Sequence, residues 1–343
     1  MSYISKIWYV AAWSSEVTPE KPVARNVIGE PIVLWRNAEG AIQAMEDRCP
    51  HRFAPLSLGR VEGDQIRCMY HGLRFDGSGK CTHVPPSDQD YPALNVRVLP
   101  TCEKDGWIWV WPGDPALADP GLAPDAWGDG AEDFALQCGS LDYNADYQLI
   151  NDNLSDLSHV DYVHETTLGA ATGNAWSKTF PTVRTLPDGI LVERWLPPVQ
   201  IDQVGGLQFE NFNSYRYLLP GIFLMRSEGY MPGTAEQCGN GRPTQPPLWV
   251  RVEQQAITPI GPGRSRYHFA TGVPRAHAEQ AESDAFFRVA QAAFEEDRTM
   301  IEGQQRILDQ TAADRDYGFI PQDKGPAIIR RLISARLRKE AGE

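Results

Sequence analysis

The sequence reads Cys49-Pro50-His51-Arg52 and, a short way further on, Cys68-Met69-Tyr70-His71-Gly72. Each cluster offers one thiol and one imidazole, the two side chains that most often bind soft or borderline metals. Two loops that face each other with these residues would present two sulfur and two nitrogen ligands. The strands on either side must then hold the two loops in place.

Two kinds of metal centre use such a ligand set. A structural zinc site takes the four groups tetrahedrally, whereas a Rieske [2Fe–2S] cluster places both cysteines on one iron and both histidines on the other. Zinc ribbons and fingers pair Cys with Cys and His with His at short spacing. Here each loop carries one of each, which favours a Rieske cluster bound by Cys49, His51, Cys68 and His71.

The first hundred-odd residues have the pattern of an all-β module. Short apolar runs are broken by Gly, Pro, Asp and Asn, with strands expected at 31–35, 97–100 and 107–111 and turns at 37–40 and 76–79. The segment 112–133 is rich in Pro, Gly, Asp and Ala, which is typical of a linker. We therefore expect a Rieske domain at 1–120 and a larger domain at 121–343.

The second domain combines strand and helix patterns. Runs at 189–195, 214–219, 249–252 and 266–270 predict an antiparallel sheet, and 231–247 reads as a long loop. Apolar residues at helical spacing predict a helix over 281–308. Asp297 lies on its apolar stripe, and a buried carboxylate needs a proton, a cation or a metal. The fold class predicted for the whole chain is α+β.

A second group of candidate ligands lies at 141–164, where the apolar spacing also predicts a helix. His159 and His164 are five residues apart, about 140° around an ideal helix, so they reach one ion only if the helix is interrupted. We expect this break near Asp161 or Tyr162. With Asp297 they would form a 2-His-1-carboxylate site for mononuclear Fe(II).

Other roles are open for several of these residues. A single histidine is more often a core or surface residue than a ligand, and Asp297 could pair with a core arginine. An aromatic and Met set could line a substrate pocket or simply fill the sheet core; its members are Phe209, Phe212, Tyr215, Phe223 and Met225.

The two Cys/His loops, followed by the segment 152–164, resemble the oxygenase component of a Rieske non-haem iron oxygenase, similar to the vanillate and dicamba O-demethylases. The resemblance covers nearly the whole chain and is weakest at 181–261. It implies that Asp297 is the third iron ligand and that Asn153 is a polar residue near the iron. It also implies that Asp156 hydrogen-bonds an iron-site histidine and a Rieske histidine of the neighbouring subunit, which requires a homotrimer.

The same resemblance implies a terminal oxygenase that uses O2 to demethylate or dealkylate a small aromatic ether or amine. Electrons would come from a separate ferredoxin or NAD(P)H-dependent reductase, since no Gly-rich nucleotide fingerprint follows a strand. An anilide N-dealkylase and a ring or methyl hydroxylase are alternatives on the same scaffold. From other classes, a Rieske electron carrier without oxygen chemistry and a zinc-stabilised structural protein are also considered.

Composition narrows the remaining choices. A chain of 343 residues fits two domains, and a formal net charge of −13 argues against a nucleic-acid partner. The cysteines are few and widely spaced, which fits a reducing compartment. Neither a secretion signal nor an apolar run of about 20 residues is evident. We expect a cytoplasmic protein without a membrane partner.

Overall fold

The computed structural model describes residues 3–87, 91–126, 133–169, 172–173, 175–201, 207–277, 280–311 and 318–342. They form two compact units. The first comprises Met1–Asp125, Thr258–Pro262 and Glu340–Glu343, and the second comprises Ala126–Ile257 and Gly263–Lys339. The predicted domain boundary at residue 120 is a single cut, so it does not assign Thr258–Pro262 and Glu340–Glu343 to the first unit.

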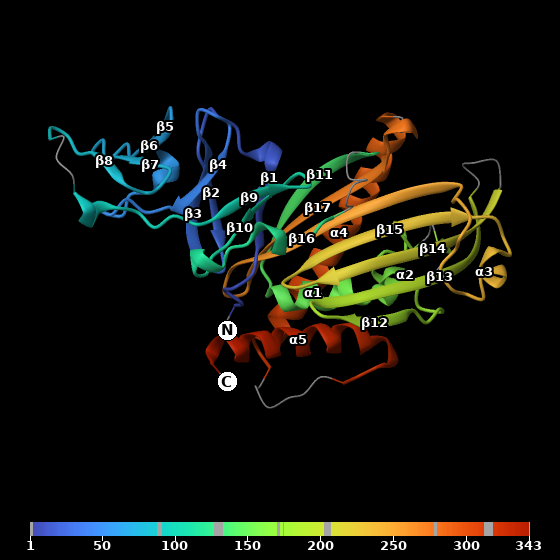
Figure 1. Cartoon of the computed structure of the whole chain (residues 1–343). Helices are drawn as coiled ribbons and strands as arrows, with labels where there is room; N and C mark the ends of the chain where they lie inside the picture. The colour runs from blue at the N-terminus through green and yellow to red at the C-terminus, as the bar shows by residue number, and fades with distance from the viewer. Residues whose placement is uncertain are drawn as a thin grey trace. The chain divides into compact units, whose positions relative to one another are not determined.

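The first unit is built from three small antiparallel sheets (Figure 1). One has the order β1 (Tyr9–Trp13), β10 (Trp107–Val110) and β9 (Thr101–Lys104). The second consists of β2 (Val23–Val27), β3 (Glu30–Arg36) and β4 (Ile42–Glu46). The third, which adjoins the Cys/His loops, consists of β5 (Arg60–Glu62), β6 (Gln65–Arg67), β7 (Arg74–Asp76) and β8 (Cys81–His83).

Strand β3 divides the core of this unit into two clusters. Ile32 and Leu34 pack in one cluster, while Val33 and Trp35 pack in the other together with the thiols of Cys49 and Cys68. Because successive side chains of a strand point to opposite faces, an unbroken apolar run is what a strand buried on both faces requires. The run at 31–35 therefore places β3 directly behind the metal loops.

The remaining expectations for this unit have mixed outcomes. The predicted turns are confirmed, with Gly40 and Gly79 both at positive φ (81° and 80°). The predicted strand at 97–100 is wrong, because only an isolated bridge between Met45 and Val98 forms there. Pro100 cannot donate to a ladder, which limits pairing at that end. The expected linker contains short 3₁₀ turns at Pro115–Leu117 and Pro120–Leu122, and its residues 127–132 lie outside the described range.

The second unit is organised on a seven-stranded antiparallel sheet. Its order is β11 (Phe134–Tyr143), β17 (Arg264–Pro274), β16 (Trp249–Gly261), β15 (Ile222–Tyr230), β14 (Leu207–Leu218), β13 (Gly189–Ile201) and β12 (Thr182–Leu186). All four strand runs predicted for this domain lie within this sheet. Together with the helices below, it confirms the α+β class.

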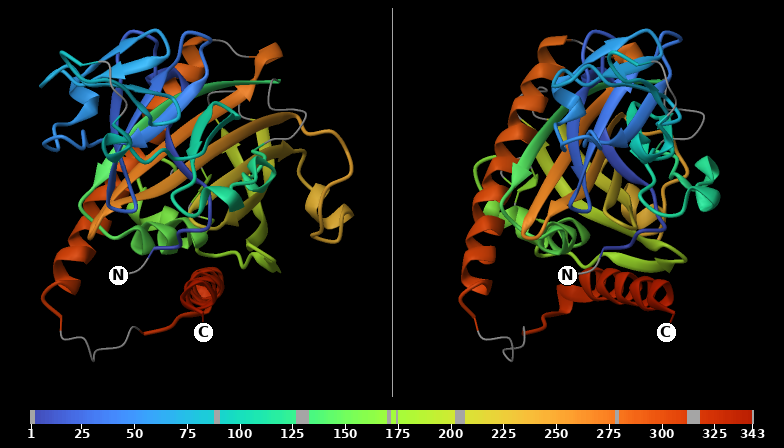
Figure 2. Two further views of the ribbon diagram at one scale, coloured as in Figure 1. Left: turned by 60° about the vertical axis from the view of Figure 1, so that its left-hand side comes forward. Right: turned by 90° about the vertical axis from the view of Figure 1, so that its left-hand side faces the viewer.

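Helices cover this sheet and carry the site. They are α1 (Tyr147–Ser155), α2 (Val160–Val163), α3 (Thr234–Gln237), α4 (Gln280–Leu308) and α5 (Lys324–Ala341). Figure 2 shows α4, in orange, running along one side of the sheet next to β11 and β17. The Tyr143 hydroxyl on β11 donates to the Phe294 carbonyl of α4 at 2.9 Å, which fixes the helix over the strand. Helix α4 matches the predicted helix within one residue at its start.

Candidate active site and metal centres

The two Cys/His loops follow the same backbone path. In each loop the cysteine amide donates to the carbonyl five residues later, at 2.9 Å for Cys49 and 2.8 Å for Cys68. In each, the cysteine carbonyl accepts from the amide four residues later, that of Phe53 at 2.8 Å and that of Gly72 at 2.9 Å. These two residues both adopt positive φ, 57° and 79°. A matched pair of tight loops is what two sides of a binuclear cluster require.

The thiols of these loops are buried, whereas the imidazoles are exposed to solvent. Cys49 and Cys68 are 2% and 1% exposed, whereas His51 and His71 are exposed with ring centroids 4.4 Å apart. Burial raises the pKa of the Cys49 thiol to about 11, so a bound metal is needed to stabilise its thiolate. Two buried sulfurs and two paired outer imidazoles fit a Rieske cluster.

The second histidine pair comes from an interrupted helix. Helix α1 ends at Ser155, Asp156 is extended (φ −135°, ψ 109°), and a 3₁₀ turn over Leu157–His159 leads directly into α2. The expected interruption between the two histidines is present one residue later than Tyr162, because Asp161 and Tyr162 are helical and α2 ends at Val163. A second interruption, which the sequence did not predict, lies at Asp156. The Asp156 carboxylate caps the new turn by accepting from the Ser158 amide at 2.9 Å.

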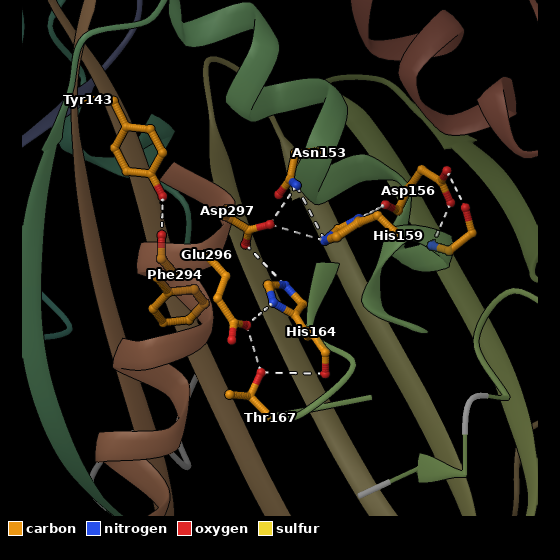
Figure 3. Close-up of polar contacts among 10 residues, drawn as sticks. Tyr143, Asn153, Asp156, His159, His164, Thr167, Phe294, Glu296 and Asp297 are labelled. Carbon is orange, nitrogen blue, oxygen red and sulfur yellow. Dashed lines mark hydrogen bonds and ion pairs between the residues drawn. The ribbon is translucent and has the colours of Figure 1, made fainter. Parts of the chain in front are cut away.

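This local geometry brings three candidate ligands together (Figure 3). The nearest ligand atoms of His159, His164 and Asp297 all lie within 4.8 Å of one another. Nε2 of His159 is 3.5 Å from Oδ1 of Asp297, and Nε2 of His164 is 3.3 Å from Oδ2. Asp297 is 4% exposed and sits on the inner face of α4, as the sequence predicts. The alternative of Asp297 pairing with a core arginine is not what the geometry shows.

Both imidazoles are oriented through their other nitrogen. Nδ1 of His159 donates to the Asp156 carbonyl at 2.8 Å, and Nδ1 of His164 donates to Oε2 of Glu296 at 2.9 Å. The lone pairs of both Nε2 atoms are therefore directed at the Asp297 carboxylate. These lone pairs and the carboxylate oxygens repel one another unless a cation lies between them. Burial acts to lower the pKa of His164, but Asp297 and Glu296 outweigh it and raise the pKa. The donor set fits a mononuclear iron.

Glu296 is a further residue of the candidate site, which the sequence did not predict. Its carboxylate also accepts from the Thr167 hydroxyl at 2.8 Å, so it is held in place from the far side. The only signal in the sequence was its position next to Asp297, in the acidic run 295–297.

The two remaining predicted residues adjoin this site differently. The Asn153 amide donates to Oδ1 of Asp297 at 2.9 Å and lies 3.3 Å from Nε2 of His159. Asp156 meets His159 through its backbone carbonyl, while its side chain accepts from Ser158. The resemblance implied a side-chain contact between Asp156 and this histidine, and the described geometry supplies a main-chain contact in its place.

A cavity opens beside the three candidate ligands. Its empty volume is about 960 Å³, solvent at the mouth included, which is within the usual range of small-molecule pockets. Its lining is mainly apolar and includes Leu154, Val160, Trp176, Phe223, Met225 and Phe294. Of the five residues suggested as pocket or core, Phe223 and Met225 line the cavity, whereas Phe209, Phe212 and Tyr215 are buried in the sheet.

Two family models match the chain and together span most of it. Residues 7–102 match the Rieske [2Fe-2S] domain, and residues 143–339 match the vanillate O-demethylase oxygenase C-terminal domain. The second match alone covers more than half of the chain.

Relatives and solved structures agree with these matches. The chain is 33% identical to the toluene-4-sulfonate monooxygenase system iron-sulfur subunit of Comamonas testosteroni, over 99% of each protein. It is 32% identical to the oxygenase component of chloroacetanilide N-alkylformylase of Rhizorhabdus wittichii, over 98% of this chain and 97% of the relative. The crystal structure of dicamba monooxygenase bound to dicamba has a TM-score of 0.88 and 29% identity, with full coverage of both chains. Another structure of that protein contains non-haem iron and dicamba.

No helix in the described part of the chain is long and apolar enough to cross a membrane.

Proposed function

Because this chain belongs to the Rieske non-haem iron oxygenases of the vanillate O-demethylase type, as the oxygenase component of a Rieske monooxygenase, we propose that it removes a methyl or alkyl group from a small aromatic ether or amine. The observation that carries this proposal is the position of the candidate iron ligands in the wall of an apolar cavity. An aromatic ring bound there would hold a substituent beside these three side chains.

The cofactors of the chain are a Rieske [2Fe–2S] cluster and a mononuclear iron. We assign the cluster to Cys49, His51, Cys68 and His71, supported by the matched loops and the sorted burial of sulfurs and imidazoles. We assign the iron to His159, His164 and Asp297, supported by the convergence of their ligand atoms. When bound, the two centres supply electron transfer and O2 activation.

The chain's own residues would bind, orient and shield the reactants. Glu296 and the Asp156 carbonyl hold the two imidazoles, and Asn153 holds the Asp297 carboxylate by its Oδ1. The apolar walls exclude water from the reacting carbon. For a methyl ether the net reaction combines the ether, O2, two electrons and two protons to give the phenol, formaldehyde and water.

An oxygenase component of this kind takes electrons from a separate protein. We propose a ferredoxin or an NAD(P)H-dependent reductase as the donor, a homotrimer as the working assembly, and the cytoplasm as its location. In the trimer, the Asp156 carboxylate would meet a Rieske histidine of the neighbouring subunit, which would shorten the electron's path. The half-buried position of Asp156 at a helix break supports this role, as do the hydrogen bonds of its side chain, which among the described residues go to Ser158 alone.

The test starts with metal content and acid-labile sulfide of anaerobically purified protein. We expect about three irons and two sulfides per chain, and about two irons in His159→Ala with the visible spectrum of the cluster unchanged. Two irons in both proteins would rule out the assigned iron site.

Turnover then decides between the substrate classes. With a reductase added, methoxy- and alkylamino-aromatics should release an aldehyde together with the phenol or amine. Products that retain all carbon atoms and gain a hydroxyl would instead establish the alternative, hydroxylation of a ring or methyl group. Release from anilides alone would establish N-dealkylation.

A further inference from the structure

A row of polar side chains crosses the sheet side of the substrate cavity. In the strand register, Asn213 of β14 lies opposite Ser227 of β15, which lies opposite Arg251 of β16. Every second residue of a strand shares a face, so Glu253 and Gln255 continue the row along β16. All five residues line the same cavity as His164 and Asp297.

The hydrogen bonds within this row leave acceptors unused. Nε2 of Gln255 donates to Oε2 of Glu253 at 2.7 Å, which fixes the direction of the Gln255 amide whenever Glu253 is ionised, because a carboxylate can only accept. Oε1 of Gln255 is then a buried acceptor that meets no donor among the described residues. Asn211, next to the row, likewise has a buried Oδ1 without a partner in the described part. Buried amide oxygens of this kind usually accept a hydrogen bond from a ligand or a water.

The charges of the row are unequally placed. Glu253 is half-buried in the cavity wall, and burial raises its pKa to about 7, although Arg251, Gln255 and His164 all act to lower it. The Arg251 guanidinium belongs to an exposed residue and stacks on the Phe286 ring at 4.3 Å. Arg251 and Glu253 both line the cavity, and Arg251 is the more exposed of the two residues.

We propose that this row selects neutral aromatic substrates that carry an N–H or O–H donor over aromatic carboxylates and sulfonates, an inference that rests on the oxygenase function proposed above for this cavity. Such a donor can bond to the free Oε1 of Gln255 and to the carboxylate of Glu253. An anionic group in the same place meets a carboxylate and carbonyl oxygens, and like charges in contact at a desolvated site cost several kcal/mol. The names of the relatives include both a sulfonate and an anilide, so membership of the family does not decide between anionic and neutral substrates.

The experiment compares matched pairs of ligands by calorimetry on the holoprotein at pH 8. Toluene-4-sulfonamide is compared with toluene-4-sulfonate, and 3-methoxybenzamide with 3-methoxybenzoate, because each pair differs mainly in charge and in the N–H donor. We expect the neutral member to bind at least about tenfold more tightly. In Glu253→Gln this ratio should fall by at least about threefold, and in Glu236→Gln, which removes an exposed carboxylate on α3, it should not change.

The outcomes separate this inference from the proposed function. A wild-type ratio below about tenfold in both pairs, or a ratio in Glu253→Gln within threefold of wild type, overturns the selectivity proposal. The visible spectrum of the cluster and the thermal unfolding curve check that the variant is folded; if it is not, the wild-type ratio decides alone. Aldehyde release is not part of this measurement, so a failure of turnover counts against the proposed function only.

Discussion

Glu296→Ala tests whether the carboxylate behind His164 is part of the iron site. In the structure Oε2 of Glu296 accepts from Nδ1 of His164 at 2.9 Å and from the Thr167 hydroxyl at 2.8 Å. Without the Glu296 carboxylate the His164 imidazole can rotate, and its Nε2 is no longer held in the direction of the metal. Loss of such a partner typically weakens metal binding by about 10–100-fold, or roughly 1.4–2.7 kcal/mol. We therefore expect the Fe(II) affinity to fall within this range.

The assay is competition for Fe(II) with a chelator of known affinity, followed anaerobically, with the cluster spectrum as a check on folding. Glu295→Ala is the matched control, since it deletes the same side chain one position earlier on α4, where the carboxylate pairs with Arg298 at 2.5 Å. An affinity for Glu296→Ala within threefold of wild type, or an equal loss in Glu295→Ala, would refute the reasoning.

Three further predictions concern packing, a buried carboxylate and pH. Gly325→Ala would place a Cβ 2.4 Å from the Ser155 carbonyl oxygen and should lower the free energy of unfolding by about 1–3 kcal/mol. The control is Gly303→Ala, whose new Cβ has its nearest contact 3.5 Å away and which should not lower that free energy. Denaturant titration measures both variants. Asp161→Ala removes the acceptor for two backbone amides and a hydroxyl, and should lower the free energy of unfolding by about 2–4 kcal/mol in the same titration. A loss below about 1 kcal/mol would contradict the anchoring role of Asp161. Because the pKa of Glu253 is raised to about 7, its charge is present above that pH and lost below it. The affinity for toluene-4-sulfonamide should therefore decline from pH 8 to pH 6 in the wild type and stay level in Glu253→Gln.

The Rieske loops were identified from sequence because their chemistry is local. Cys49 and His51, like Cys68 and His71, lie within three residues of each other, and the turn and strand signals around them depend on neighbouring residues only. The inward direction of Asp297 was also predictable, because helical periodicity alone places it on the apolar stripe of α4.

The end of α1 at Asp156 was not predicted, whereas α2 ends within one residue of the expected break. Within α2 the Asp161 carboxylate accepts from the Trp176 and Ser177 amides, a tertiary contact that holds this helix in place. The chain turns at Asp156, where an extended residue precedes the 3₁₀ turn.

The sequence by itself determined which side chains can bind metal and that Asp297 lies on the inner face of a helix. Only the tertiary structure decided that Glu296 orients His164 and that Glu253 and Gln255 enter the substrate cavity. Periodicity assigns a residue to a face, but it does not specify which distant element that face meets. The contact between residues 164 and 296 and the register of β14, β15 and β16 arise from long-range packing, for which neighbouring residues in the sequence carry no signal.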